Sequence, residues 1–483
     1  MFPTFRLFLV CLLTAAPAAA QIPTQTRLAV TPSPSQRGQE ATLFATVWAT
    51  DGTPAGDVAF TSDGTPLGTV ALAALGPDQG RVVGGESHGC AIAVDGQVQC
   101  WGWNGDRQLG DGTLTNRPAP VTVQGLPGGD PVVQLAAGGR HTCAVTESGA
   151  LWCWGYNASG QLGVGTITQV FVPVQVPGFG AGTRHVAAGG NHTCAVDAAG
   201  GAWCWGSNIY GQLGDGTLDR RTSPTAVPGF ASGVAQVAAG ERHSCFVLTN
   251  GRVRCWGDNT FGQLGDGTTT ASLLPVPVVN GRRTAQLAAG AYHTCMVRDG
   301  STRLRCWGRN AYGQLGDGTS TTQSAPVTVP GLAVTAFALG GNHSCAIDTR
   351  ARAWCWGRNA AGQVGDGTQV NTTSPTRVQF AGRVRNWALA AQSNSSCAQR
   401  ENGALTCWGS NTLGQTGDGT TTSPRLLPVA VVGGAFAWPR AAAFARLVTS
   451  TLPRGRHELR AAYPGSATHA GSTSAAVRHR VQR

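Results

Sequence analysis

The chain has few charged residues and no lysine. Charged side chains make up 12% of its 483 residues, whereas about a quarter is usual in globular proteins. The net charge of +11 therefore comes from arginine alone. Because the arginines are scattered along the sequence, they favour solvated faces over a nucleic-acid site. We expect no nucleic-acid partner, although Arg220, Arg221, Arg282 and Arg283 form two adjacent pairs that leave salt-sensitive binding to nucleic acid open.

Long apolar runs and helical periodicity are also missing. After residue 20 there is no run of about 18 apolar residues, so the sequence predicts no membrane span. No stretch shows the helical period of about 3.6 residues, so few helices are expected. Residues 1–20 resemble a secretory signal peptide, with Arg6 before an apolar stretch and small residues up to Ala20. We expect a protein that is secreted or at the cell surface.

Fourteen cysteines remain once residues 1–20 are removed, and they fall into seven pairs. The first cysteine of most pairs follows His-Thr or His-Ser, and the second begins Cys-Trp-Gly. The pairs are Cys90 and Cys100, Cys143 and Cys153, Cys194 and Cys204, Cys245 and Cys255, Cys295 and Cys306, Cys345 and Cys355, and Cys397 and Cys407.

The spacing within each pair fits a β-hairpin with its two cysteines directly opposite. With a turn centred on Ser148, Cys143 lies opposite Cys153, which brings them within reach of a disulfide. A signal peptide with paired cysteines is typical of an oxidising compartment. Zinc knuckles need closer ligand spacing than this. The sequence therefore predicts seven disulfides, each within one hairpin, and no metal site.

The pairs recur with a fixed period. The first cysteines of successive pairs are 50 to 53 residues apart. A period of about fifty residues is typical of propeller blades. Short apolar runs punctuated by Gly, Asp-Gly and Pro indicate strands and tight turns. We predict an all-β fold with a seven-bladed β-propeller over residues 78–434. Since the first unit lacks a preceding Pro-Val strand, we expect residues 427–432 to complete the first blade and close the ring.

These repeats resemble the regulator of chromosome condensation repeat family. The shared motif is Gly-x-x-His-Thr/Ser-Cys-Ala-Val, then Cys-Trp-Gly-x-Asn-x-x-Gly-Gln-Leu-Gly-Asp-Gly-Thr, and it recurs over residues 80–434. The resemblance implies a β-propeller, and its secreted bacterial type is the best guide because of the signal peptide and the cysteine pairs. Function does not follow from the fold alone.

The two ends of the chain resemble halves of one bacterial immunoglobulin-like repeat. Residues 58–70 hold an Asp-Gly turn between short alternating strands, and Tyr463 begins a Tyr-Pro-Gly motif near the other end. We predict an immunoglobulin-like β-sandwich formed from residues 27–74 and 437–480, with the propeller inserted into it. Two unrelated flanking segments are the alternative.

Polar residues at two repeated positions, one histidine and one aspartate in most repeats, are candidates for catalysis or metal binding. Histidine precedes the first cysteine at His88, His141, His192, His243, His293 and His343, and Ser395 takes the seventh place. Aspartate of Gly-Asp-Gly-Thr stands at Asp111, Asp215, Asp266, Asp317, Asp366 and Asp418, with Val164 in the remaining repeat. Because every repeat supplies the same neighbours, we interpret them as packing and turn residues. We assign no catalytic residue, no metal ligand and no cofactor.

Function is expected where the repeats differ. Two positions vary sharply: the residue after Trp-Gly and the residue before Gly-Gln-Leu. The predicted binding face consists of Trp103, Tyr156, Tyr210, Asp258, Phe261, Arg309, Tyr312 and Arg358. Trp, Tyr and Arg are the types enriched at protein-binding hot spots, but ordinary variation in exposed turns explains the pattern equally well.

The sequence thus predicts a secreted, monomeric, non-enzymatic propeller that binds an extracellular protein and inhibits or regulates it. A cell-envelope structural or adhesion protein that binds glycans or surface proteins is the alternative. An enzyme with its site in the central channel ranks last.

Overall fold

A computed structural model describes residues 21–482 with short gaps. The gaps are 22–23, 32–34, 37–40, 50–55, 72, 75–80, 94–95, 129, 381–382, 389–393, 401–403, 434–440, 450–451 and 467–469. The predicted signal peptide, residues 1–20, lies outside the described part. Every helix or strand in the described part is a β-strand, and none of its elements is a helix long and apolar enough to cross a membrane.

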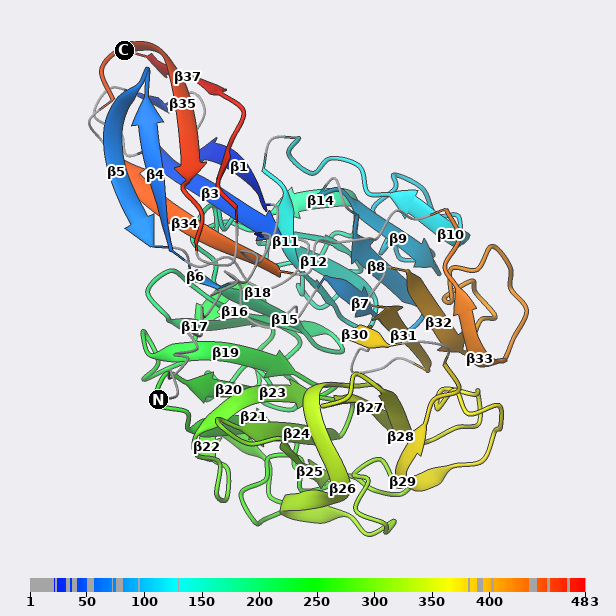
Figure 1. The fold of residues 1–483 in the computed structure, drawn as a ribbon. Helices are drawn as coiled ribbons and strands as arrows, with labels where there is room; N and C mark the ends of the chain where they lie inside the picture. The colour runs from blue at the N-terminus through cyan, green and yellow to red at the C-terminus, as the bar shows by residue number, and fades with distance from the viewer. Residues whose placement is uncertain are drawn as a thin grey trace, which may run out of the picture. The chain divides into compact units, whose positions relative to one another are not determined.

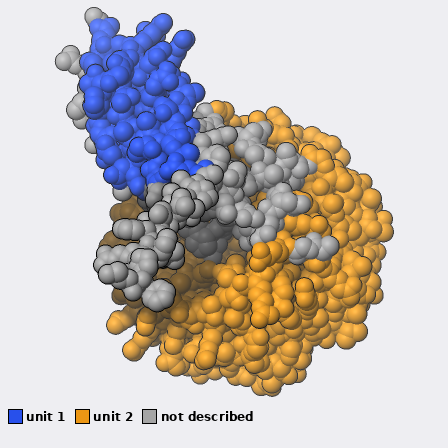
Figure 2. Space-filling view, in the orientation of Figure 1, with its two compact units in different colours: residues 1–75, 439–483 blue, residues 76–438 orange. Residues whose placement is uncertain are grey.

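The chain divides into two compact units, coloured separately in Figure 2. Unit 1 combines residues 1–75 with residues 439–483, and unit 2 spans residues 76–438. The two ends of the sequence therefore build one unit, and the cysteine repeats build the other.

Unit 2 is built from seven blades, each of four antiparallel strands in chain order. The second blade shows the pattern: β11 (Val132–Ala137), β12 (His141–Thr146), β13 (Leu151–Gly155) and β14 (Val170–Gln175). In its hairpin Cys143 stands opposite Cys153, which is the predicted register. The long strand β26 is shared: it is the last strand of the fifth blade and the first strand of the sixth.

The other blades repeat this order. The first has β7 (Val82–Gly84), β8 (His88–Ile92), β9 (Val98–Gly102) and β10 (Arg117–Thr122); the third has β15 (His185–Ala188), β16 (His192–Val196), β17 (Ala202–Gly206) and β18 (Arg221–Ala226); the fourth has β19 (Val234–Ala239), β20 (His243–Leu248), β21 (Val253–Gly257) and β22 (Ser272–Pro277). The fifth and sixth have β23 (Thr284–Ala289), β24 (His293–Arg298), β25 (Arg303–Gly308), β26 (Gln323–Leu339), β27 (His343–Asp348), β28 (Ala353–Gly357) and β29 (Thr372–Arg377); the seventh has β30 (Val384–Ala388), β31 (Ser395–Arg400), β32 (Leu405–Gly409) and β33 (Arg425–Ala430).

All seven predicted disulfides are confirmed. Each joins the two central strands of one blade, with Cα atoms 4.0–4.1 Å apart. The fifth pair, Cys295 and Cys306, encloses one residue more than the others. The cysteines are buried in the blade cores, so each bridge fixes a hairpin from within.

The blades form a ring in which the last packs on the first. Each Cys-Trp-Gly tryptophan is buried in the hydrophobic cluster of the preceding blade, as Trp154 is among the residues of the first blade. At the seam, Trp101 of the first blade packs on Cys407 and Leu405 of the seventh. Its indole N–H donates to the carbonyl oxygen of Gln415, 3.0 Å away. Figure 1 shows β30 beside β7, completing the propeller-like arrangement.

The prediction that residues 427–432 complete the first blade is wrong. Residues 427–432 were expected to join the first blade, but β33 pairs with β32 in the seventh blade. The first blade already has four strands of its own, because β7, β8, β9 and β10 form one sheet with β7 and β10 at its edges. The Pro-Val segment ends a blade and does not begin one. The ring is therefore closed at the seam by side-chain packing and by hydrogen bonds, such as that from Gly419 N to Pro118 O at 2.8 Å.

Hydrogen bonds from the repeated histidines join neighbouring blades. His141 Nε2 lies 2.9 Å from Thr193 Oγ1 of the next blade. Thr193 Oγ1 donates to the carbonyl oxygen of Gln161 at 2.8 Å, so it accepts the proton of Nε2. The same link joins His88 to Thr142, His192 to Ser244, His243 to Thr294, His293 to Ser344 and His343 to Ser396. The histidines thus hold the ring together, in agreement with the packing interpretation.

At the seam between the seventh and first blades, both partners of this histidine–hydroxyl hydrogen bond are replaced. Ser395 replaces the histidine of the seventh blade, and Gly89 replaces the hydroxyl residue of the first. A Cβ atom at Gly89 would lie 2.7 Å from the ring of Trp101. The close approach of Trp101 explains why a glycine stands here.

Unit 1 consists of two sheets that share one hydrophobic core. The first sheet contains β1 (Thr24–Thr31), β3 (Ala41–Ala49), β34 (Ala441–Thr449) and β6 (Ala73–Ala74). The second contains β2 (Ser35–Gln36), β37 (Val477–Gln482), β35 (Gly455–Tyr463), β4 (Asp57–Ser62) and β5 (Thr65–Ala71), with β36 (Ser472–Thr473) paired to β35. Leu43 and Val47 of the first sheet and Phe60 and Leu459 of the second belong to the same buried cluster.

Candidate binding face

Three variable positions of each blade lie at one end of its central hairpin. The residue after Trp-Gly donates its N–H to the carbonyl of the residue before the histidine. Arg309 N, for example, is 2.8 Å from Tyr292 O, and Asp258 N is 2.9 Å from Arg242 O. These two positions are therefore held side by side by the backbone.

The third position, before Gly-Gln-Leu, is held by a glutamine side chain. The N–H of Phe261 donates to Gln263 Oε1 at 2.8 Å, and Tyr210 and Tyr312 are bound in the same way by Gln212 and Gln314. The buried asparagine of Trp-Gly-x-Asn braces this loop, since its Oδ1 accepts the leucine N–H and its Nδ2 donates across the turn. Invariant polar residues thus fix the backbone, and the variable side chains are presented on it.

Seven of these variable side chains interleave into one group, which we call the arginine–aromatic array. It extends over four successive blades, from the third to the sixth. Its members are Tyr210, Arg242, Phe261, Tyr292, Arg309, Tyr312 and Arg358.

Each guanidinium of the array lies against aromatic rings. Arg242 Cζ is 4.4 Å from the ring centroid of Tyr210 and 5.5 Å from that of Tyr292. Arg309 Cζ is 5.1 Å from the ring centroid of Phe261. These distances allow cation–π attraction of about 0.5–1 kcal/mol for an exposed contact.

The array continues across the next blade boundary. Arg309 Cζ is 5.6 Å from the ring centroid of Tyr312, and Arg358 Cζ is also 5.6 Å from it. The rings of Phe261 and Tyr292 meet edge to face, with centroids 5.5 Å apart. The rings thus orient the arginines and reduce the side-chain freedom that binding would cost.

The arginines of the array keep their charge available. All seven members are partly exposed. Within the described residues, Arg242, Arg309 and Arg358 make no ion pair. Burial raises the pKa of Tyr292, and the nearby charges of Glu241 and Asp258 raise it further against the opposing effect of Arg242. Tyr292 therefore stays a neutral hydrogen-bonding phenol at neutral pH.

The remaining predicted face residues, Trp103, Tyr156 and Asp258, are not members of the array. Trp103 stacks under Arg140, whose Cζ is 5.1 Å from the ring centroid, and Arg140 also pairs with Asp106 at 3.6 Å and Glu86 at 3.4 Å. Tyr156 is partly exposed. Asp258 is only 7% exposed, and its Oδ1 accepts hydrogen bonds from the N–H and the hydroxyl of Thr260. Asp258 supports its loop and is not presented to a partner.

Two members of the array, Arg242 and Tyr292, were not predicted. Both occupy the position before the histidine, which also differs from repeat to repeat: Ser87, Arg140, Asn191, Arg242, Tyr292, Asn342 and Asn394. That variation was visible in the sequence. It was missed because only the hairpin register brings this position beside the residue after Trp-Gly.

The repeated histidines and aspartates have structural roles. Burial lowers the pKa of His293 to about 3, with a smaller contribution from His343. Asp215 Oδ1 accepts hydrogen bonds from Thr217, and its Oδ2 pairs with Arg221 at 2.8 Å. In the described part of the chain, no three His, Cys, Asp or Glu side chains form a group that could hold a metal ion.

Family profiles match most of unit 2. The profile of the RCC1-like domain matches residues 63–300. The profile of the regulator of chromosome condensation (RCC1) repeat matches residues 303–347 and 351–398, and a second RCC1 repeat profile matches residues 334–363.

Among the proteins similar to the chain are two curated relatives and one solved structure. The ultraviolet-B receptor UVR8 of Arabidopsis thaliana is 35% identical over 254 residues, which is 52% of this chain and 57% of UVR8. The human E3 ubiquitin-protein ligase HERC2 is 31% identical over 276 residues, 55% of this chain but 6% of HERC2. The chain thus spans little more than half of one relative and a small part of the other.

The solved structure is yeast RCC1 (Prp20) bound to Kap60. It superposes with a TM-score of 0.63 at 22% identity and covers 74% of this chain and 90% of its own. This likeness supports the propeller-like fold of unit 2.

Proposed function

Because the chain carries an RCC1-like domain and regulator of chromosome condensation (RCC1) repeats, we propose that it is a regulatory propeller that binds another protein through the arginine–aromatic array. Yeast RCC1 was solved bound to a protein, Kap60. The observation that carries the proposal is the array itself: three arginines that make no ion pair within the described part of the chain, held against four aromatic rings across four blades.

The chemistry of the array favours an acidic partner segment with apolar side chains. Carboxylates can bind the free edges of Arg242, Arg309 and Arg358, and charge-assisted hydrogen bonds of this kind are stronger than neutral ones. Phe261 and the tyrosine rings offer apolar contact beside each charge. Because the rings already orient the arginines, less side-chain entropy is lost on binding.

The compartment and the accessory unit are part of the same proposal. We infer that the protein is secreted or held at the cell surface, because seven disulfides require an oxidising compartment to form and persist. Its partner is then an extracellular protein. Unit 1, proposed to be immunoglobulin-like because two sheets enclose its core, acts as a spacer or anchor. We propose no enzymatic activity and a monomeric state.

The test compares two triple variants of the same net charge. Array variant R242Q/R309Q/R358Q neutralises the array. Control variant R252Q/R282Q/R350Q neutralises three exposed arginines in or next to turns at the opposite end of the blade strands. Wild type and both variants are used to capture proteins from the native extracellular mixture.

The expected result is a partner captured by wild type and by the control variant but lost from the array variant. Its affinity should also fall steeply as salt is raised. A partner retained equally by both variants would overturn the assignment of the array. Binding only to washed cell surfaces or to glycans would instead favour an envelope or adhesion role.

A further inference from the structure

The exposed face of the second sheet of unit 1 carries a strip of arginines. Along β35 and β37 side chains alternate between the core and solvent, as His457 and Leu459 point inward. The outward set contains Arg456, Glu458, Arg460, Arg478 and Arg480, and Arg454 precedes β35. Along these two strands and at Arg454, one acidic residue accompanies five arginines, so this strip is strongly positive.

The register puts two of these arginines directly opposite each other. Arg456 pairs with Arg480 across the strands, whereas Glu458 pairs with Arg478. The second pair has complementary charges. The first places like charges at the closest cross-strand spacing, which is destabilising unless something compensates. Within the described residues, no acidic side chain forms an ion pair with Arg456 or Arg480.

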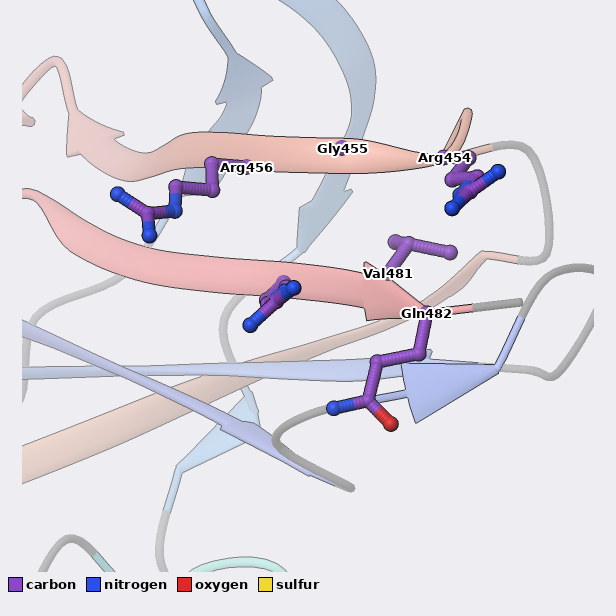
Figure 3. A pocket seen from close by; sticks show the side chains of 6 residues that line it. Arg454, Gly455, Arg456, Val481 and Gln482 are labelled. Carbon is purple, nitrogen blue, oxygen red and sulfur yellow. The ribbon is translucent and has the colours of Figure 1, made fainter.

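A pocket lies at the uncompensated pair. Its volume is about 380 Å³, and Arg454, Gly455, Arg456, Arg480, Val481 and Gln482 line it. Figure 3 shows Arg454 and Arg456 on one side of it, with Gln482 on the neighbouring strand β37. Its described lining residues therefore offer several N–H donors and no acidic side chain.

We propose that this pocket binds a phosphate group. A phosphate between Arg456 and Arg480 would turn their repulsion into two attractions, and planar guanidinium groups match phosphate oxygens with paired N–H donors. Arg454 and the amide of Gln482 would complete the donor set. The phosphate can come from free inorganic phosphate or from a lipid headgroup, and the experiment separates these sources.

The pocket variant is R456Q/R480Q, and the matched control is R460Q/R478Q. Both remove two positive charges from the same exposed face, but only the first pair lines the pocket. Binding of inorganic phosphate to the full chain is measured by calorimetry. Wild type and the control should bind in the millimolar range, and the pocket variant at least tenfold more weakly.

Folding is checked in the same experiment. The pocket variant should melt no lower than wild type without phosphate, because it removes a repulsion. Added phosphate should raise the melting temperature of unit 1 in wild type and not in the pocket variant. Absence of phosphate binding to wild type, or equal weakening in both variants, would overturn the proposal.

Vesicles identify the source. They contain either phosphatidylglycerol with phosphatidylcholine or phosphatidylcholine alone. A larger loss of binding to the anionic vesicles in the pocket variant than in the control would support the site with a lipid as its source. The two variants could instead lose vesicle binding equally while only the pocket variant loses binding to inorganic phosphate. That result would support the site with soluble phosphate as its ligand.

Discussion

Mild acid should unfold unit 2, because six buried histidines must stay neutral in the ring. Burial lowers the pKa of His88, His141, His192, His293 and His343 from 6.5 to about 3, and that of His243 to about 4. Each Nε2 donates to the next blade, while each Nδ1 is buried without a hydrogen-bond partner. A second proton on Nδ1 would place an unpaired charge in the core.

Whether acid raises or lowers the stability of unit 2 depends on whether the folded or the unfolded state binds more protons. Unfolded histidines take up protons near pH 6.5, and the folded ones resist until about pH 3 or 4. Stability is therefore full above pH 6.5 and falls as the pH drops toward those values. One pH unit corresponds to about 1.4 kcal/mol for each group, so the six ring histidines lose roughly 8 kcal/mol per unit. His185, also in unit 2, adds to this loss because burial lowers its pKa to about 4. Since the free energy of unfolding of a domain is about 5–15 kcal/mol, the midpoint of acid unfolding should lie at about pH 5.5.

The assay is urea unfolding followed by tryptophan fluorescence between pH 8 and pH 5 with the disulfides intact. The seven Cys-Trp-Gly tryptophans are buried in unit 2, so they report on the ring. Linkage predicts that unfolding at about pH 5.5 takes up roughly six protons, one of them on His185 and the rest on the six ring histidines.

The variant H192Q should lower this uptake by about one proton, because an amide can donate to Ser244 without titrating. R252Q, an exposed change, should leave the uptake unchanged. Free energy of unfolding that stays flat between pH 7 and pH 5 would refute the account of the histidines.

Two further predictions concern the ring. In G189A the new Cβ would lie 2.3 Å from His192 Cε1 and 2.5 Å from a neighbouring backbone oxygen. The free energy of unfolding should therefore fall by about 3 kcal/mol or more. The control is G128A, whose new Cβ meets no atom within 4 Å, and it should change the free energy of unfolding little. In C194A/C204A the loss of one hairpin bridge should cost about 2–3 kcal/mol by the loop-entropy model, and an unchanged midpoint in guanidinium would show that the bridge does not stabilise the folded state.

Local patterns predicted the blades because the cysteine spacing fixes the hairpin register. Cys143 and Cys153 are opposed as expected, and the histidines pack between blades. Ring closure was mispredicted because it depends on where a blade begins. A repeat read from any starting point has the same period, and only the pairing of β33 with β32 shows that the Pro-Val strand is the last of its blade.

The candidate face was predicted in part, for a related reason. Variation between repeats identified Tyr210, Phe261, Arg309 and others, but variation does not separate a presented side chain from a bracing one such as Asp258. Arg242 joined the array only through contacts between blades. Contacts of that kind depend on the rotation of one blade relative to the next, which no local pattern encodes.

The most direct test of the array is the dissociation constant of the captured partner for wild type, R242Q/R309Q/R358Q and R252Q/R282Q/R350Q at one salt concentration. The account predicts a constant at least about a hundredfold higher for the array variant, as expected when about 3 kcal/mol of hot-spot contact is lost, and a constant within about twofold of wild type for the control. Equal constants for the two variants would contradict it.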